Sequence, residues 1–330
     1  MKFLAILLAV LSLAEAQTTQ PFDGTPWNLS TGNLSVSFIR CSPIGAAPQA
    51  NFFEPPPSVE SLKKLRAEGL VNYEDYVAWG AVERERGKWD WTQHDRVYEA
   101  MHAAGLPYAV YTWVHFPPVW LRESQDRTLM KCLEHGKETN YLSIFDPKTI
   151  EWYDHFYKAL HDHFGDKIDE VYACILGPYG EGNYPLNVPD WVNIGHCHEG
   201  YWCGDAFAQK AFRAAMGAKY ASIEALNKAC GTSFALFDEA TMPPWISESF
   251  KPNPIAFRTA QDRRRWLDFI TWYHEAIIDF AEKSIQTTLK YFPKEKVRTK
   301  PGGNAGGVNP IAWGTYCPGY AKMADRKSVV

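Results

Sequence analysis

Hydrophobic residues follow two spacings along the chain, and their alternation predicts strands and helices in turn. Five short segments show the two-residue alternation or the dense β-branched and aromatic content of strands: residues 34–40, 71–79, 107–114, 170–176 and 297–299. Apolar residues recur at helical spacing between them, over residues 58–70, 92–104, 147–164, 205–220, 222–230 and 262–291. We expect helix-capping roles for Ser58, Thr92, Asp146 and Asp205.

This order of elements predicts an α/β fold. Strands that alternate with helices form a parallel sheet with right-handed crossovers. The short spacing of the first strands and the one-sided helices predict a (β/α)8 TIM barrel over residues 17–330. An open doubly wound sheet is the competing fold, but the G-x-G-x-x-G loop that would follow its first strand is absent.

The number of residues after the fifth predicted strand indicates how much of a barrel we expect. That strand begins near Val297, whereas a whole barrel takes about 250 residues in regular units. We therefore expect the barrel to be incomplete at the C-terminus, truncated after about strand five.

The first residues predict export. Met1 and Lys2 give a positive start, residues 3–13 are apolar, and an A-x-A cleavage site follows at residues 14–16. The apolar run is shorter than the roughly 20 residues that span a bilayer, so we expect a signal peptide at residues 1–16 rather than a membrane span. A buried first helix is the alternative. The mature chain is expected to be secreted, with glycosylation sequons at Asn28 and Asn33.

Composition narrows the class of partner. The chain has 34 basic and 38 acidic residues, and this lack of a basic excess argues against a nucleic-acid partner. Its 13 tryptophans, 17 tyrosines and 18 phenylalanines are typical of proteins that stack on sugar rings, although core packing accounts for most aromatic residues in most proteins. We expect a carbohydrate partner and no cofactor, and the oligomeric state stays open.

Polar residues gather where the predicted strands end, which is where a TIM barrel carries its chemistry. The segment after the fourth strand, residues 177–185 with the sequence GPYGEGNYP, is the most informative. Glu181 stands there between two glycines, which let a substrate approach, and near aromatic side chains, which exclude water. Exclusion of water raises the pKa of a carboxyl, so Glu181 is a candidate general acid. The alternative is a solvent-exposed glutamate in a turn.

Two family resemblances extend this interpretation. Residues 77–91, with the sequence VAWGAVERERGKWDW, resemble a run in clan A glycoside hydrolases and are most similar to the β-galactosidases of family 42. Residues 206–231 also resemble the segment after the acid/base strand of that family. Residues 177–185 are instead similar to the β-amylase signature G-P-x-G-E-x-x-Y-P. Family 42 has an asparagine before its acid/base residue, whereas this chain has Gly180.

The resemblance implies a (β/α)8 glycosidase that cleaves O-glycosidic bonds with two carboxylates. Glu181 matches the acid/base residue of both families, and Glu83 matches a glutamate that is structural. Sugar-binding roles are expected for Trp79, Trp113, His115, Tyr179, Asn183 and Tyr184. In the loop after the fifth strand, Lys300 and Asn304 are further candidates for substrate contact.

The second carboxylate is not apparent, because no glutamate follows Glu295. Its distance from the acid would decide the stereochemistry. The clan A run suggests retention of configuration and the β-amylase signature suggests inversion, so both stay open.

Seven cysteines in an exported chain predict disulfide chemistry. Cys197 and Cys203 are close in sequence and are expected to pair. His196 and His198 add metal-type ligands, but their spacing with these cysteines fits a four-ligand zinc site poorly. We therefore favour a disulfide over zinc here and expect no metal site.

Two other functions remain as alternatives to a hydrolase. One is a non-catalytic carbohydrate-binding barrel fragment that lacks the second carboxylate, and binding of oligosaccharide without turnover would identify it. The other is a secreted structural or interaction protein whose barrel likeness is only architectural, because a fold does not fix a function. The absence of any sugar binding would favour that alternative.

Overall fold

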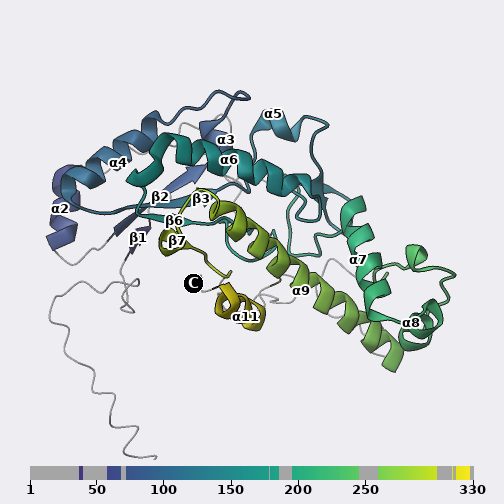
Figure 1. Cartoon of the computed structure of the whole chain (residues 1–330). Helices are drawn as coiled ribbons and strands as arrows, with labels where there is room; N and C mark the ends of the chain where they lie inside the picture. The colour runs from purple at the N-terminus through teal and green to yellow at the C-terminus, as the bar shows by residue number, and fades with distance from the viewer. Residues whose placement is uncertain are drawn as a thin grey trace, which may run out of the picture.

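A five-stranded parallel sheet organises the molecule. The computed structural model describes residues 37–39, 58–67, 72–177, 179–185, 195–244, 259–302, 314 and 317–327. The sheet has the order β1 (Ser37–Ile39), β2 (Asn72–Ala78), β3 (Tyr108–Trp113), β6 (Glu170–Tyr172) and β7 (Val297–Arg298) (Figure 1). All five predicted strands are confirmed. Their order in the sheet follows their order in the chain, as successive units of a TIM barrel require, and within the described residues the sheet is open.

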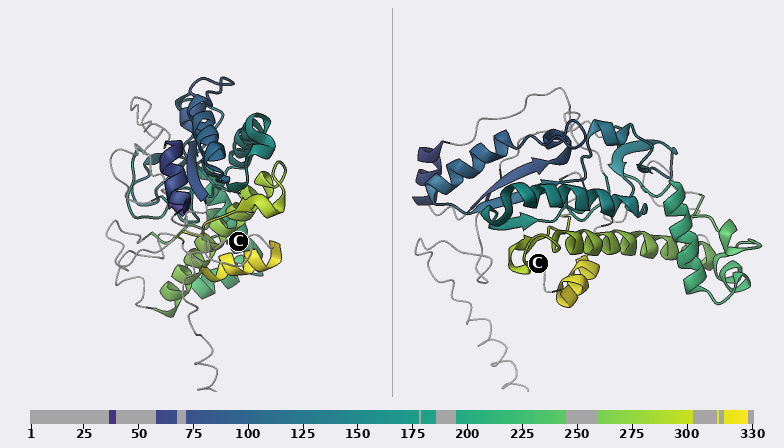
Figure 2. Two further views of the ribbon diagram at one scale, coloured as in Figure 1. Left: turned by 90° about the vertical axis from the view of Figure 1, so that its left-hand side faces the viewer. Right: turned by 45° about the horizontal axis from the view of Figure 1, so that its top comes forward.

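Four helices connect neighbouring strands and form one outer layer. These are α2 (Val59–Ala67), α4 (Thr92–Ala104), α6 (Lys148–Phe164) and α9 (Ala260–Thr288). Helix α2 packs on α4, and α6 packs on α9. The rings of Trp91 and His163 stack at 5.4 Å and join α4 to α6. Figure 2 shows the helices curving around the sheet, as the one-sided hydrophobic pattern predicts.

The capping predictions have mixed outcomes. Asp205 accepts hydrogen bonds from the first backbone N–H groups of α7 (Ala206–Lys219), and Ser222 does the same for α8 (Ile223–Cys230). Ser58 and Asp146 also accept backbone N–H groups, from Ser61 and Lys148. The prediction for Thr92 is wrong, because Thr92 is the first helical residue of α4 and Asp90 accepts its N–H.

Several elements were not predicted from the hydrophobic pattern. These are an antiparallel hairpin of β4 (Leu129–Lys131) and β5 (Glu138–Leu142), helices α3 (Trp79–Val82), α5 (Val119–Arg122) and α11 (Cys317–Lys327), and 3-10 turns at Gly165–Lys167, Phe237–Glu239 and Lys294–Lys296. The strands of three to five residues and the helices of four are too short to show a period, whereas α11, with 11 residues, is long enough and was missed. The start of α9 was placed two residues late, because the capping box of Thr259 and Asp262 was not recognised.

The two faces of the sheet carry different side chains. Toward the helices, Thr112 bonds the Tyr157 hydroxyl at 3.0 Å. On the opposite face, the strand register places Tyr76 beside Tyr111 and Tyr111 beside Tyr172. Their rings meet edge to face at 5.0 and 5.4 Å. The side chains on this inner face therefore form a row of tyrosines, the tyrosine row, rather than an aliphatic core.

No helix within these ranges combines the length and apolar character that crossing a bilayer requires. The predicted signal peptide and both sequons lie outside the described residues, so the structure does not bear on them.

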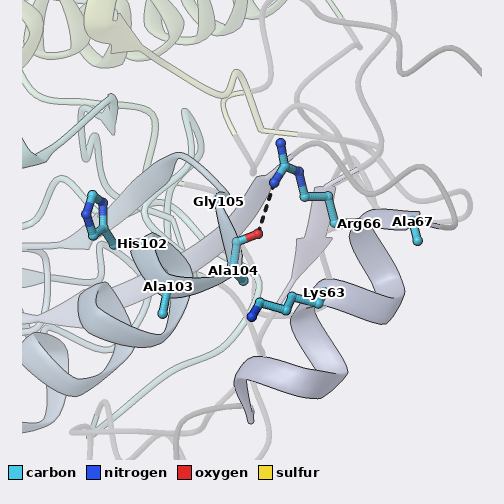
Figure 3. Close-up of a pocket in the computed structure, with 7 residues that line it drawn as sticks. All are labelled: Lys63, Arg66, Ala67, His102, Ala103, Ala104 and Gly105. Atoms are coloured by element: carbon cyan, nitrogen blue, oxygen red, sulfur yellow. Dashed lines mark hydrogen bonds between the residues drawn. The ribbon is translucent and has the colours of Figure 1, made fainter.

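A surface hollow lies where α2 and α4 end, at the opposite end of the strands from their carboxyl ends. Its lining is Lys63, Arg66, Ala67, His102, Ala103, Ala104 and Gly105 (Figure 3). Arg66 Nη1 donates to the Ala104 carbonyl at 3.2 Å and so satisfies the C-terminus of α4. The hollow therefore lies beside a helix-capping contact, at the end of the sheet away from Glu181.

Gly105 and Gly217 form a matched pair for testing this helix end. Gly105 has a φ of +70°, and a Cβ there would lie 2.2 Å from Arg66 Nη1. We predict that Gly105→Ala lowers the free energy of unfolding by about 1–2 kcal/mol, because the left-handed conformation is costly for alanine. Gly217→Ala, in the last turn of α7 with only ordinary contacts, should leave the stability unchanged or raise it. Urea unfolding of both variants checks this, and equal effects would contradict it.

Candidate active site

A tight turn after β6 fixes the position of Glu181. The N–H groups of Ile175 and Leu176 donate to the carbonyls of Gly180 and Glu181 at 2.8 and 3.0 Å, so the chain doubles back along its own strand. Gly177 and Gly180 supply the positive φ values, +48° and +85°, that this turn needs. The carboxylate is therefore presented from a rigid turn at the carboxyl end of a strand.

Neighbouring strands hold this turn on both sides. A Cβ at Gly180 would lie 3.2 Å from the Thr112 carbonyl and 3.5 Å from Trp113 Cδ1, so only a glycine sits easily against the end of β3. On the other side, the Gly182 N–H donates to the Lys300 carbonyl beyond β7 at 3.0 Å. Three strand ends thus meet around Glu181, as expected for parallel strands.

Burial and charge act in opposite directions on Glu181. Partial burial raises the pKa of its carboxyl above the ordinary value, and the positive charge of Lys300 lowers it by a smaller amount. Burial and the nearby Glu181 charge also raise the pKa of the Tyr111 phenol, which keeps that group protonated. Glu181 therefore tends to hold its proton at a higher pH than an exposed glutamate.

Lys300 connects Glu181 to a second carboxylate on the inner face of the sheet. Its ammonium lies 2.9 and 3.0 Å from the two oxygens of Glu74, whose side chain is 2% exposed. The same ammonium lies over the rings of Tyr111 and Tyr172, 4.4 and 4.6 Å from their centroids. Glu74 therefore forms an ion pair with Lys300, and the charge of Lys300 also acts on Glu181.

Four of the predicted substrate-binding residues lie around Glu181. The Trp113 ring is 6.2 Å from His115 and 6.3 Å from Tyr179. Asn183 is buried within the Glu181 turn, and its carbonyl accepts the Gly177 N–H at 2.6 Å. The structure brings these residues together, and their contact with a sugar stays a prediction.

The other three predicted residues are placed differently. Trp79 is fully buried against α5 and α6, with its ring near Trp120 and Phe156. Tyr184 is also fully buried: it stacks on Tyr273 of α9 at 3.8 Å and donates its hydroxyl to the Tyr273 carbonyl. Both side chains pack in the core and do not join the group around Glu181. Asn304 lies outside the described residues.

Glu83 has the structural role that the sequence predicts. Its carboxylate is fully buried and accepts hydrogen bonds from Trp79 Nε1 at 2.6 Å and from the Gly87 N–H at 2.7 Å. His155 Nε2 lies 3.0 Å from both oxygens. With its oxygens so occupied, Glu83 holds α3 to α6 and has no capacity left for a substrate.

Four buried polar groups gather on this side of the sheet; sequence reasoning predicted Trp113 and Asn183 but missed Tyr111 and Tyr141. The Tyr111 and Tyr141 hydroxyls, Trp113 Nε1 and Asn183 Oδ1 are buried and have no hydrogen-bond partner within the described residues. The Tyr141 ring lies 5.5 Å from that of His115, whose Nδ1 is 3.2 Å from Cys174 Sγ. Tyr111 could have been found, because it alternates with Trp113 along β3. Tyr141 comes from the unpredicted hairpin and gave no signal.

The predicted disulfide does not form in the structure. Neither Cys197 nor Cys203 is in a disulfide. Cys203 is buried in the core, where its sulfur lies 3.5 Å from Met242 Sδ. His196 and His198 instead meet Cys132 and His135, which the spacing argument did not consider.

Comparison with known families now decides between the two resemblances. Residues 44–318 match the profile described as Glycosyl hydrolase family 14. The chain belongs to glycosyl hydrolase family 14. The expectation that family 42 is the most similar family is therefore corrected. The β-amylase-like turn around Glu181 was the better guide, and the run at residues 77–91 is not specific to family 42.

Individual relatives of this family 14 chain agree with the assignment. It is 26% identical over 294 residues to a thermophilic β-amylase of Thermoanaerobacterium thermosulfurigenes, covering 83% of this chain and 49% of the relative. A β-amylase of Cytobacillus firmus is 27% identical over 290 residues, covering 82% and 59%. The chain thus spans about half the length of these relatives.

Solved structures share the fold. The catalytic domain of the β-amylase from Paenibacillus polymyxa superposes with a TM-score of 0.65 at 22% identity, covering 84% of this chain and 73% of that one. Gan42B, a GH42 β-galactosidase from G. stearothermophilus, gives 0.56 at 18% identity, covering 81% and 35%. The family 14 chain has a TIM-barrel-like glycoside hydrolase fold, of which the described residues form an open five-stranded part.

Glu83 can be tested against a glutamate two residues away. We predict that Glu83→Ala lowers the free energy of unfolding by about 3 kcal/mol, because buried donors on Trp79 and Gly87 lose their acceptor. Glu85→Ala removes only an exposed ion pair with Lys88 and should change little. Denaturant unfolding of both variants measures this, and a tolerated Glu83→Ala would show that the carboxylate does not hold α3 in place.

Proposed function

We propose that this family 14 chain hydrolyses O-glycosidic bonds with Glu181 as the general acid. The observation that carries the proposal is the position of Glu181: a partly buried carboxyl with a raised pKa, on a rigid turn at the carboxyl end of β6. A general acid must hold a proton at the working pH and be able to release it to the leaving oxygen. Family membership supports the same assignment.

We further propose an amylose-type glucan as the substrate in place of a β-galactoside. The family 14 match and relatives named β-amylases support this choice. The four buried polar atoms on Tyr111, Trp113, Tyr141 and Asn183 also support a ligand rich in hydroxyl groups. Such atoms are costly to leave without partners, and sugar hydroxyls both donate and accept hydrogen bonds.

The proposed reaction follows from the charges. Glu181 donates its proton to the glycosidic oxygen as the bond to the anomeric carbon breaks. A water molecule attacks that carbon from the opposite face and gives its proton to a second carboxylate, so the configuration inverts. The β-amylase-like turn and the family favour inversion over retention. Glu74 is a poor candidate for the second carboxylate, because it is buried and paired with Lys300.

Replacement of the acid tests the proposal. We predict that Glu181→Gln lowers kcat on maltohexaose by at least about 10²-fold with an unchanged circular dichroism spectrum, because the amide cannot donate the catalytic proton. Glu224→Gln, at an exposed site on α8, is the matched control and should retain the wild-type rate. Equal rates for Glu181→Gln and wild type would refute the role of Glu181. An aryl β-galactoside assayed in parallel tests the substrate class.

A binding module is the second candidate, since no carboxylate among the described residues is assigned as the catalytic partner of Glu181, and the nearby Glu74 is paired with Lys300. Calorimetric titration of the wild-type chain with maltohexaose, together with a product assay, separates the two functions. Binding without any product would support the module. Product with the inverted anomeric configuration by proton NMR would support the hydrolase.

The charge of Lys300 sets a testable pH dependence. Activity that needs protonated Glu181 is lost as the pH rises through its pKa, and Lys300 lowers that pKa. We predict that the double variant Glu74→Gln/Lys300→Met shifts the alkaline limb of kcat/KM to higher pH. Glu74 is replaced as well, because it would otherwise lose its cation while buried.

Glu74→Gln alone is the control for this variant. It keeps the Lys300 charge and removes the carboxylate that neutralises it, so its alkaline limb should not move to higher pH. A double variant with an unmoved or lowered limb would contradict the electrostatic coupling.

We also propose that the chain is exported, on the basis of the signal-peptide pattern in residues 1–16. Sequencing the N-terminus of the protein recovered from the culture medium tests this, with Gln17 expected as the first residue.

A further inference from the structure

Two loops bring four potential metal ligands together beside the fold described above. Cys132 follows β4, and His135 lies in the turn of the β4–β5 hairpin. His196 and His198 follow Gly195, which forms a β-bridge with Thr139 of β5. One ligand atom from each of the four residues can be chosen so that all lie within 4.8 Å of one another.

The spacing of these atoms is that of a tetrahedral zinc site. Cys132 Sγ lies 3.5 Å from His135 Nδ1 and 3.5 Å from His196 Nε2, and the two nitrogens are 3.2 Å apart. Zn–S and Zn–N bonds of about 2.3 and 2.0–2.1 Å at tetrahedral angles separate sulfur from nitrogen by about 3.5–3.6 Å and nitrogen from nitrogen by about 3.3–3.4 Å. Both sulfur–nitrogen separations match these values, and the nitrogen–nitrogen separation is about 0.1 Å shorter.

The fourth ligand is oriented by a backbone contact. His198 Nδ1 lies 2.7 Å from the Glu199 carbonyl oxygen, which can only accept a hydrogen bond. Nδ1 therefore carries the proton, and Nε2 of the neutral ring keeps its lone pair for a metal. Such an outer contact is typical of histidine ligands. The His198 ring is 4.7 and 4.9 Å from the rings of His135 and His196.

The backbone around the cluster is rigid. Gly136 takes a φ of +65° and donates its N–H to the Cys132 carbonyl at 3.0 Å, which closes the hairpin turn. The Leu133 N–H donates to the Tyr201 carbonyl at 2.7 Å, and the Gly204 N–H donates to the Lys131 carbonyl at 2.8 Å. These bonds fix the two loops to each other independently of any metal, so the ligands are pre-positioned.

We propose that this family 14 chain binds one Zn²⁺ through the Cys132 thiolate, His135 Nδ1, His196 Nε2 and His198 Nε2. One thiolate and three imidazoles in tetrahedral arrangement suit Zn²⁺ better than hard cations, which prefer oxygen. The four protein ligands fill the coordination sphere, so the site is structural rather than catalytic. Binding releases the proton of the Cys132 thiol.

The site supports the segment that carries Glu181. The Trp202 ring lies 5.2 Å from that of His198, and Trp202 Nε1 donates to the Pro185 carbonyl at 2.9 Å. Pro185 follows the Glu181 turn in the chain. Zinc bound between the β4–β5 hairpin and the segment that carries His196, His198 and Trp202 would therefore stiffen one side of the candidate active site. It would not contact the substrate.

Metal analysis of the purified chain tests the proposal. After expression in zinc-supplemented medium and dialysis, inductively coupled plasma mass spectrometry should find about one zinc per chain in the wild type. Cys132→Ser and His198→Ala should each retain less than a tenth of it. The matched controls Cys230→Ser and His102→Ala, which alter a cysteine and a histidine outside the cluster, should keep the wild-type content.

A second measurement does not depend on whether the variants fold. Wild-type chain stripped with a chelator and titrated with Co²⁺ should develop the intense visible bands of tetrahedral cobalt and a thiolate charge-transfer band at one equivalent. The Tm should fall on stripping and recover with Zn²⁺. Wild-type protein with no stoichiometric zinc and no cobalt bands, or a Cys132→Ser variant with full zinc content, would overturn the proposal.

Discussion

The hydrogen-bonded turn after β6 is the constraint on which the candidate site depends. It reverses the chain within a few residues, and two glycines with positive φ are needed for that reversal. Because the turn is tied to the ends of β3 and β7, the Glu181 carboxyl is held where three parallel strands end. A flexible loop at this point would let the carboxyl turn to solvent, and its pKa would return to the ordinary range.

The inner face of the sheet sets the electrostatics around that carboxyl. The tyrosine row gives an aromatic surface, and Lys300 lies over two of its rings while paired with Glu74. One half-buried cation therefore acts on two acids: it forms an ion pair with Glu74 and limits how far burial raises the pKa of Glu181. The balance between burial and one nearby charge is the physical basis for an acid whose pKa lies above that of an exposed glutamate.

Hydrophobic spacing predicted the large elements because each buries one apolar face, α2 and α4 beside the sheet and α7 and α8 against α9. The five strands, the long helices and most of the caps follow from that pattern, and the Glu181 turn follows from its glycines. The β4–β5 hairpin did not, since its strands are too short to show a period. Tyr141 and the partners of His196 were missed for the same reason, because that hairpin carries them.

The direction in which side chains point was the other feature that the sequence did not predict. Trp79 and Tyr184 stand at strand ends in sequence, yet both turn into the core, toward α6 and α9. An aromatic side chain next to a strand end can point toward the site or into the core. The helix that packs against the strand end determines which of the two occurs. The family assignment shows a related limit: the run of tryptophans and acids at residues 77–91 suggested family 42, yet it builds a structural corner around Glu83, and the family 14 match extends over residues 44–318.

The most direct test of the account is the titration of the Glu181 carboxyl itself. Infrared difference spectra of wild type minus Glu181→Gln, recorded against pH, isolate the carboxylic C=O stretch of this one group. The account predicts a band that persists above the pKa of about 4.3 of an unperturbed glutamate. A carboxyl that loses its proton at or below that value would contradict the claim that the turn holds Glu181 out of water as an acid.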